Sequence, residues 1–323
     1  MLFIRGNIYR KKCEFMRILN FGSLNLDFVY NVGHIVHPGE TISSTALEIF
    51  PGGKGLNQSI ALARAGAAVC HAGMIGEDGD LLLSTCKENG VDITYTQTIE
   101  ERSGNAIIQV DANGQNSIVL FGGANQCNQK SYVDRVLENF GAEDWLLLQN
   151  EISLLDYIIK KAAERGIHIA LNPSPYNSKI ESCDLSKIHL FFLNEVEGEQ
   201  MTGQTQPEEI LSVMKKQYPQ ANVVLTLGKR GVVYQAHDAV YTHGIYDVPV
   251  VDTTAAGDTF TGYFLEGVSN GEPPKEVLRI ASIASSLAVS RKGASPSIPW
   301  KNEVQAAKLT EIISNDNDNK IKI

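Results

Sequence analysis

Two aspartates frame a run of small residues in the stretch VDTTAAGDTFTGYF, which covers residues 251–264 of the 323-residue chain. The alanines and the glycine leave backbone N–H groups uncovered just before a helix that the spacing of apolar residues predicts from Thr259 onward. Uncovered amides at a helix N-terminus bind anions such as phosphate. Asp258 would lie beside that anion, where a carboxylate is unfavourable unless it has a chemical role. The alternative is structural, with Asp258 as a helix N-cap and Asp252 as a loop acid.

A second glycine-rich segment, PGGKGLNQSIALARAG (residues 51–66), also leads from a strand-like stretch into a predicted helix. Lys54 and Asn57 stand close to a backbone without side chains, an arrangement that suits a ligand rich in hydroxyl groups. Neither GGKG nor the later GKRG (residues 228–231) matches the phosphate-binding pattern GxxxxGK[ST]. The alternative interpretation is a tight turn followed by an ordinary capped helix.

The overall composition favours a small molecule as the partner of this chain. Twenty-eight basic and 37 acidic residues give a formal net charge of −9, which disfavours nucleic acid and anionic membrane surfaces. No apolar run reaches the ~20 residues of a membrane span, and Arg5 interrupts the first apolar stretch before a signal peptide could form. The five cysteines form no CxxC pair and indicate neither a disulfide framework nor a zinc site: Cys13, Cys70, Cys86, Cys127 and Cys183. We therefore expect a cytoplasmic protein.

Alternating strand-like and helix-like segments must position these residues. Apolar runs such as WLLLQ (residues 145–149) and IHIALNP (residues 167–173) alternate with helical patterns such as SLLDYIIKKAAERG (residues 153–166). This alternation predicts an α/β fold with a parallel sheet covered by helices on both faces. Ligands bind such sheets beyond the carboxyl ends of the strands, so the loops that follow strands are where a site is expected.

Short β-rich segments near residues 25–52 and 103–123 interrupt this alternation, with DANGQ as a hairpin turn. We interpret them as a small lid of strands on a single domain that covers residues 17–300. An extension over residues 1–15 precedes this domain, and a C-terminal helix and tail over residues 301–323 follow it. A lid of exposed strands has bare edges, which the pairing of two lids in a homodimer would cover.

Seven motifs, in the order of the chain, carry a resemblance to a known family: GSLNLD (22–27), GGKGLNQ (52–58), NPSP (172–175), NEVE (194–197), TLGKRG (226–231), DTTAAGDTFTG (252–262) and RKGASPSIPW (291–300). Over about residues 17–300 the chain resembles the PfkB family of sugar kinases, and within it the ribokinases. The resemblance implies a ribokinase-like α/β fold, with three α/β/α layers, a mainly parallel central sheet and a small β-sheet lid. It also implies ATP-dependent phosphorylation of D-ribose at the 5-hydroxyl, which gives D-ribose 5-phosphate and ADP.

The resemblance, followed residue by residue, implies a catalytic centre. Asp258 matches the general base, and Ala256 and Gly257 match the residues whose amides form the anion hole. A carboxylate with an ordinary pKa of ~3.9 is too weak to deprotonate an alcohol outright, so proton transfer must come late in a loose transition state. The implied sugar-binding residues are Asn25, Asp27, Gly53, Lys54, Asn57, Glu151 and Asp258 itself.

The resemblance further implies a nucleotide site and two kinds of metal site. Asn194 and Glu197 would organise Mg²⁺ and the phosphates, with Glu197 acting through water. The implied ATP-binding residues are Asn194, Thr226, Gly228, Gly231, Gly257 and Ser282. Oxygen atoms would hold an activating K⁺ ion, and the implied residues are Asp252, Thr254, Ala288, Arg291, Gly293 and Ser297.

Two departures from the ribokinase pattern bear on the substrate. Leu56 stands where alanine is common in GGKGANQ, and FGGAN, beginning at Phe121, stands where HAGAN is common. Either change could alter sugar preference, so a kinase of deoxyribose, another pentose or a nucleoside is the alternative within the family. A non-catalytic sugar-sensing protein on the same fold is the alternative outside it.

Overall fold

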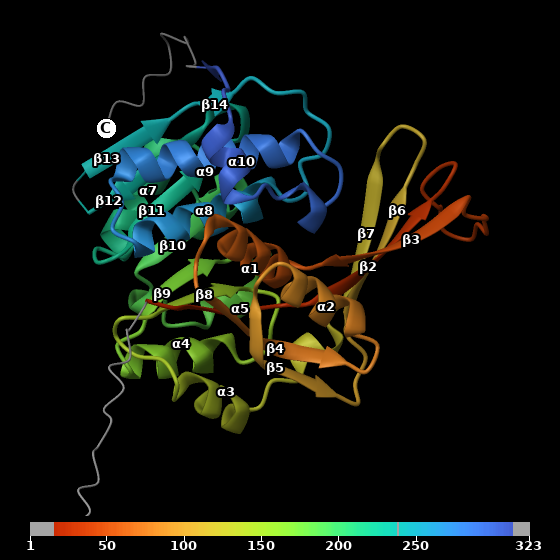
Figure 1. The fold of residues 1–323 in the computed structure, drawn as a ribbon, viewed down its shortest axis with the longest axis horizontal. Helices are drawn as coiled ribbons and strands as arrows, with labels where there is room; N and C mark the ends of the chain where they lie inside the picture. Colours follow the sequence, from red (N-terminus) through yellow and green to blue (C-terminus); the bar gives the residue numbers. More distant parts are fainter. Residues whose placement is uncertain (1–15, 238, 313–323) are drawn as a thin grey trace, which may run out of the picture.

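A computed structural model describes residues 16–237 and 239–312 of the protein (Figure 1). Within these residues the main sheet has nine strands in the order β13-β12-β11-β10-β9-β8-β1-β4-β5. Every neighbouring pair is parallel except β11–β12 and β12–β13, which confirms the predicted mainly parallel sheet. In chain order the strands are β1 (Ile18–Phe21), β4 (Val69–Gly76), β5 (Asp92–Ile99), β8 (Trp145–Gln149), β9 (His168–Asn172), β10 (Leu190–Asn194), β11 (Asn222–Thr226), β12 (Val232–Ala236) and β13 (Ala239–His243). Residues 1–15 and 313–323, which include Cys13, the predicted extension and part of the predicted tail, lie outside the described residues.

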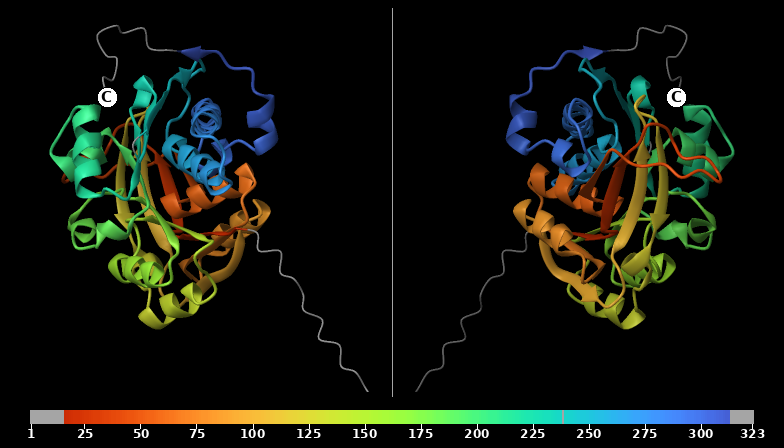
Figure 2. Two further views of the ribbon diagram at one scale, coloured as in Figure 1. Left: turned by 90° about the vertical axis from the view of Figure 1, so that its left-hand side faces the viewer. Right: turned by 90° about the vertical axis from the view of Figure 1, so that its right-hand side faces the viewer.

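Helices cover both faces of this sheet and complete three α/β/α layers (Figure 2). Alternate residues of one strand enter opposite cores: Leu146 and Leu148 of β8 pack on one side and Leu147 on the other. The core around Leu147 includes helices α1 (Lys54–Ala65), α2 (Asp80–Glu88), α8 (Ala256–Ser269), α9 (Pro274–Val289) and α10 (Lys301–Ala306). The opposite core includes α3 (Lys130–Leu137), α4 (Leu155–Glu164), α5 (Ser178–Glu181), α6 (Glu195–Thr202) and α7 (Pro207–Gln217). Short 3₁₀ turns are η1 (Gly123–Gln126), η2 (Leu185–Lys187), η3 (Gly228–Arg230) and η4 (Ser295–Ser297).

A second sheet projects from this body and forms the lid (Figure 1). Its strands run in the order β3-β2-β6-β7 and are β2 (Asn25–Asn31), β3 (Ala46–Gly52), β6 (Gly104–Val110) and β7 (Asn116–Phe121). The hairpin predicted at DANGQ joins β6 to β7: the Asp111 N–H donates to the Gln115 carbonyl at 3.0 Å, and Gly114 has a φ of 78°, which favours glycine. A further pair, β14 (Ile245–Tyr246) and β15 (Glu311–Ile312), lies near the C-terminus of the described chain.

Helix α8 begins at Ala256, three residues before the start that apolar spacing predicted. Ala256 and Gly257 therefore lie in the first turn of the helix and not in the loop before it. Asp258 lies inside that turn, and its side chain accepts hydrogen bonds from another helix. The N-cap interpretation of Asp258 is wrong, since Ala255 is the N-cap residue.

No helix within residues 16–237 and 239–312 is both long enough and apolar enough to cross a membrane.

Candidate active site

The lid and the carboxyl ends of the main-sheet strands border a cleft of about 630 Å³. Most of the residues predicted to bind sugar, phosphate, nucleotide or metal line it: Asn25, Asp27, Gly53, Lys54, Asn57, Glu151, Asn194, Glu197, Thr226, Gly228, Thr254, Gly257 and Asp258. The predicted residues outside the lining are Gly231, Asp252, Ala256, Ser282, Ala288, Arg291, Gly293 and Ser297. The structure therefore assembles one site from segments more than two hundred residues apart in the sequence.

The carboxylate of Asp258 is buried at the floor of this cleft, with 8% of the residue exposed. Its Oδ2 accepts a hydrogen bond from Asn57 Nδ2 at 3.0 Å, and its Oδ1 accepts one from Gln58 Nε2 at 2.8 Å. Burial raises the pKa of Asp258 to about 6, although these amide donors and the Lys54 ammonium act in the opposite direction. The carboxylate is thus a stronger base than an ordinary aspartate and is still ionised at neutral pH.

The first turn of α8 supplies amides beside this carboxylate, but not the pair that was predicted. The Ala256 N–H donates to the Thr253 carbonyl at 3.2 Å, so this amide is engaged within the loop. The N–H groups of Gly257 and Asp258 have no acceptor among the described residues. Gly257 lines the cleft, and a Cβ built on it would meet no atom within 4 Å. The two amides able to receive an anion are those of Gly257 and Asp258, because the Ala256 amide is already bonded.

An ion pair organises the opposite end of the cleft. Glu151 accepts hydrogen bonds from the Lys54 backbone N–H at 3.1 Å and from Lys54 Nζ at 3.0 Å, and Ser23 Oγ donates to the same carboxylate. Burial disfavours the Lys54 ammonium, but Glu151 outweighs this effect and the pKa of Lys54 is raised. Asp27, which extends from β2, has its pKa raised to about 7 by burial and by the nearby Glu151 charge. This end of the cleft therefore presents one cation and two carboxyl groups.

Two asparagines add hydrogen-bonding groups between these ends. Asn25 Oδ1 accepts from Asn125 Nδ2 at 2.8 Å, while the Oδ1 of Asn57 is buried and has no partner within the described residues. A buried carbonyl oxygen without a donor is costly, and a ligand hydroxyl would satisfy it. The donor set fits a polyhydroxylated ligand between Asp27 and Asp258.

Asn194 and Glu197 line the cleft at the start of α6. Asn194 Oδ1 accepts from the Glu197 N–H at 2.9 Å, and Glu197 Oε2 accepts from the Asn194 N–H at 2.8 Å, which forms a capping box. Gly231, with a φ of 88°, and Ser282, buried in α9, are not among the residues that line the cleft. The resemblance implied Ser282 as an ATP-binding residue, and this role stays a prediction.

Hydrogen bonds join several of the residues predicted to hold K⁺. Asp252 accepts hydrogen bonds from the Thr254 N–H at 2.9 Å and from the Gly293 N–H at 3.0 Å, which joins two distant segments. Burial opposes ionisation of this group, but these bonds hold the pKa of Asp252 below its usual value. The Ala288 carbonyl already accepts from the Arg291 N–H at 3.0 Å, and a carbonyl oxygen has a second lone pair.

Several lining residues were not singled out from the sequence. Asn172 is the last residue of β9 and Ser174 follows this strand, and the NPSP motif was their only signal. Ile108, Ile118 and Leu120 cover the cleft from the lid. The two departures from the ribokinase pattern lie elsewhere: Leu56 is fully buried in the core, and Phe121 is 51% exposed on the lid outside the lining.

Comparison with known proteins places this chain in a family. The model of the pfkB family of carbohydrate kinases matches residues 17–301. A ribokinase from Haemophilus influenzae is 34% identical over 292 residues, which is 87% of this chain and 95% of the relative. A structure of Arabidopsis thaliana ribokinase complexed with ribose and ATP has a TM-score of 0.79 and 29% identity, covering 90% of this chain and 97% of that one. A deoxyribokinase from Salmonella typhi is 28% identical over 293 residues, covering 88% and 96%.

The motifs, the three-layer fold with its lid, and these similarities agree over nearly the whole described chain. The chain belongs to the PfkB family of carbohydrate kinases and is a sugar kinase with a ribokinase-like α/β fold.

Proposed function

We propose that this chain transfers the γ-phosphoryl group of ATP to the 5-hydroxyl of D-ribose, giving D-ribose 5-phosphate and ADP. One observation carries the proposal: the buried Asp258 carboxylate and the unpartnered Gly257 amide meet in a single cleft whose far end holds Asn25, Asp27 and Lys54. A proton acceptor, an anion site and a diol-binding end are the three parts that phosphorylation of a sugar hydroxyl requires.

Asp258 acts as the general base in this proposal. Its oxygens already accept one hydrogen bond each from α1, which leaves lone pairs on the carboxylate for the attacking hydroxyl. The pKa of about 6 remains far below that of an alcohol, so the proton moves late, when the bond to phosphorus is forming. The Gly257 and Asp258 amides donate to the oxygens of the transferred group and stabilise its charge.

Mg²⁺ fits the nucleotide side of the cleft because Glu197 is buried there and, among the described residues, only its Oε2 accepts a hydrogen bond. Glu197, with Asn194, would hold the metal through water molecules. When bound, the ion neutralises phosphate charge. The residues of the chain then position the sugar hydroxyl and exclude water beneath the lid.

Product analysis tests the reaction. Incubation of the full chain with ATP, Mg²⁺ and D-ribose should yield a ³¹P signal coupled to the two C5 protons of the sugar. Phosphate on C1 would refute the proposed regiochemistry. ATP consumption that does not respond to any sugar would instead favour the sugar-sensing alternative.

Deoxyribose is the second candidate substrate, because a deoxyribokinase is among the relatives. Competition between D-ribose and 2-deoxy-D-ribose for one limited pool of ATP distinguishes the two. We expect ribose 5-phosphate to predominate, since the diol-binding end of the cleft offers a partner to the 2-hydroxyl. An excess of the deoxy product would transfer the proposal to deoxyribose.

The Asp27 carboxyl predicts a pH dependence of sugar binding. Its pKa of about 7 in the ligand-free cleft means that it is protonated below neutrality and accepts two hydroxyl hydrogen bonds only above it. The KM for the sugar should therefore fall as pH rises through 7, by about tenfold per unit on the acid side. Asp27→Asn should raise the KM and remove this dependence. A wild-type KM that is constant from pH 6 to pH 8 would contradict the assignment.

K⁺ is proposed to activate the enzyme from behind the anion site. Asp252 joins the segment before α8 to the segment at Gly293, and an anionic oxygen cluster there suits a weakly hydrated cation. At constant ionic strength, replacing tetramethylammonium by K⁺ should raise kcat severalfold, and Asp252→Ala should abolish the response. Equal rates in both salts would refute the cation site.

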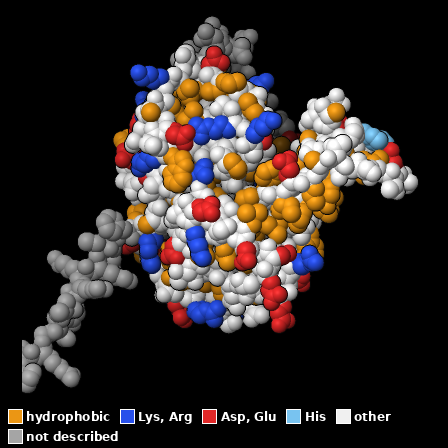
Figure 3. All heavy atoms as spheres, turned by 45° about the vertical axis from the view of Figure 1, so that its right-hand side comes forward, with side chains coloured by type: hydrophobic (Ala, Val, Ile, Leu, Met, Phe, Trp, Pro, Cys, Tyr) orange, Lys and Arg blue, Asp and Glu red, His pale blue; other side chains and the backbone are white. Residues whose placement is uncertain are grey.

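A homodimer through the lid is proposed from its exposed apolar surface (Figure 3). Ile107 is 45% exposed, and Ile118, Val119 and Leu120 are between 52% and 65% exposed. Successive side chains of a strand point to opposite faces, so Leu120 of β7 faces the cleft and Val119 faces the opposite side of the lid. Sedimentation velocity should give a dimer for the wild type and a monomer for the double variant Val119→Lys, Leu120→Lys. A wild type that is still monomeric at a protein concentration of about 50 µM, which is about the weakest Kd expected of a specific dimer, would exclude this association.

A further inference from the structure

A continuous chain of buried amide side chains leads away from Asp258 into the main sheet. Gln58 Nε2 donates to Asp258, and Gln58 Oε1 accepts from Gln149 Nε2 at 2.6 Å. Gln149 Nε2 also donates to Asn20 Oδ1 at 3.0 Å. The three amide residues Gln58, Gln149 and Asn20 are fully buried and lie on α1, β8 and β1.

The far end of this chain is anchored in the core. Asn20 Nδ2 donates to the Gly55 carbonyl at 2.7 Å and to Ser59 Oγ at 2.8 Å. Ser59 Oγ in turn lies 2.8 Å from Nδ1 of His71, which is fully buried. With a neutral His71 ring, the Ser59 hydroxyl can donate to Nδ1 while its oxygen accepts from Asn20. Burial lowers the pKa of His71 to about 4, in agreement with a neutral ring.

The direction of these bonds determines which atom of Gln58 faces the base. A flipped Gln58 amide would place its carbonyl oxygen against the Asp258 carboxylate and its NH₂ group against the NH₂ of Gln149. Both contacts would be repulsive, so Gln149 selects the orientation in which Gln58 donates. In this arrangement the Oε1 of Gln149 is buried and has no hydrogen-bond partner among the described residues.

We propose that Gln58, oriented by Gln149 and Asn20, is a positioning residue that holds the Asp258 carboxylate in the rotamer facing the attacking hydroxyl and keeps it ionised. The proposal rests on the assignment of Asp258 as the general base. Gln58 does not line the cleft, so its effect reaches the substrate only through Asp258. The charged groups that also act on Asp258 are Lys54 on α1 and Glu151 after β8, and the substitutions below leave both in place.

The test is the pH profile of kcat for two variants of Gln58. Gln58→Met keeps the length but removes the donor, and it should lower kcat about 10- to 100-fold with sugar and ATP KM values within about threefold. The pH below which the kcat of this variant falls should move to a higher value. Gln58→Glu places a second carboxyl group against Asp258 and should move this pH further, because like charges disfavour ionisation. Gln149→Met should give an intermediate loss.

Gln235→Met is the matched control, because Gln235 is a buried glutamine on β12 outside the cleft lining. It should leave kcat and its pH profile unchanged. A Gln58→Met enzyme that is less stable but keeps the wild-type kcat and pH profile would overturn the proposal. If Asp258→Asn also retained turnover, the base assignment itself would have failed, so the two failures are distinguishable.

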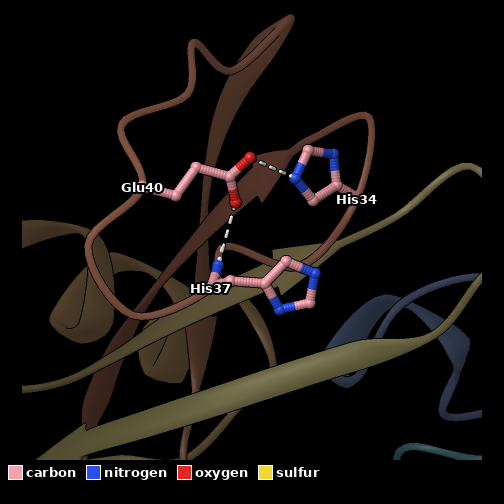
Figure 4. Close-up of side chains that lie close together, drawn as sticks. All are labelled: His34, His37 and Glu40. Atoms are coloured by element: carbon pink, nitrogen blue, oxygen red, sulfur yellow. Dashed lines mark hydrogen bonds and ion pairs between the residues drawn. The ribbon is translucent and has the colours of Figure 1, made fainter.

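A separate cluster on the lid carries a second, independent inference. The loop between β2 and β3 brings His34, His37 and Glu40 together, with their potential ligand atoms all within 4.8 Å of one another (Figure 4). His34 Nε2 lies 2.8 Å from Glu40 Oε1, and the His37 backbone N–H donates to Glu40 Oε2 at 3.0 Å. The loop is anchored, since the Val36 N–H donates to Gln109 Oε1 at 3.0 Å.

We propose that this loop binds one divalent transition-metal ion of the Zn²⁺ class. Two imidazoles and one carboxylate form a donor set that zinc prefers, and water can complete the coordination because all three residues are exposed. The backbone bond from His37 holds the carboxylate in place before any ion arrives. None of the three residues lines the cleft, so this site is distinct from the one that handles ATP.

Isothermal titration of the metal-free full chain with ZnCl₂ tests this second proposal. One ion per chain should bind, and His34→Ala and His37→Ala should each weaken binding at least about tenfold. His237→Asn, at an exposed histidine on another turn, should bind as the wild type does. Unchanged affinity in both alanine variants, or no heat of binding in the wild type, would overturn the proposal.

Discussion

Asp258→Asn is expected to lower kcat by about 10²- to 10⁴-fold while the KM values for sugar and ATP change little. The substitution removes the proton acceptor but keeps its size. The fold should tolerate it, because the Oδ1 of Asn57 has no partner and a flipped Asn57 amide can accept from the new NH₂ group. Initial rates of ADP release, measured with a coupled assay, provide the comparison.

The pH profile distinguishes a lost base from a distorted site. Burial raises the pKa of Asp258 to about 6, so the base form is lost as pH falls through that value and the wild-type kcat should fall with it. The residual activity of Asp258→Asn should lack this limb. Turnover within a few-fold of the wild type, or an unchanged acidic limb, would show that another group accepts the proton.

Gly257→Val is the second substitution with a large expected effect. Gly257 lines the cleft at the point where two unpartnered amides face the expected phosphate. Valine would fill this space and block access to the amides, so kcat should fall below about one-thousandth of the wild-type value. The fold should persist, because a Cβ at this position meets no atom within 4 Å and the backbone does not require glycine.

Gly141→Val is the matched control for this substitution. Gly141 lies outside the cleft, and a Cβ there also meets nothing within 4 Å. This variant should keep wild-type activity, and the two variants should melt at similar temperatures. An active Gly257→Val enzyme would mean that these amides do not form the anion hole.

Local patterns in the sequence were sufficient for the features that depend on neighbouring residues. The alternation of strand-like and helix-like segments predicted the mainly parallel sheet, and DANGQ predicted the hairpin of the lid. The motif resemblance brought Lys54, Asn57 and Asp258 to one cleft, which spacing alone could not do. Asp258 is about two hundred positions from Lys54 and Asn57 in the sequence, and the packing of α1 against α8 brings them together.

Features that depend on hydrogen-bond direction could not be predicted in this way. The Ala256 amide donates to the Thr253 carbonyl, so the amides without an acceptor among the described residues are those of Gly257 and Asp258, one residue further along than the predicted pair. Gln58 lies within a recognised motif, but its role depends on Gln149, 91 residues away. Ser282, which the motif resemblance implied as an ATP-binding residue, is buried in α9 and does not line the cleft, so its role stays a prediction.

The most direct test of the central claim is kcat/KM measured with D-ribose, 2-deoxy-D-ribose, other pentoses and nucleosides under one set of conditions with ATP, Mg²⁺ and K⁺. We predict the highest value for D-ribose, at least about tenfold above 2-deoxy-D-ribose, because a hydrogen-bonding site rejects a ligand that lacks the matching hydroxyl. A nucleoside or another pentose with a higher kcat/KM than D-ribose would contradict the account.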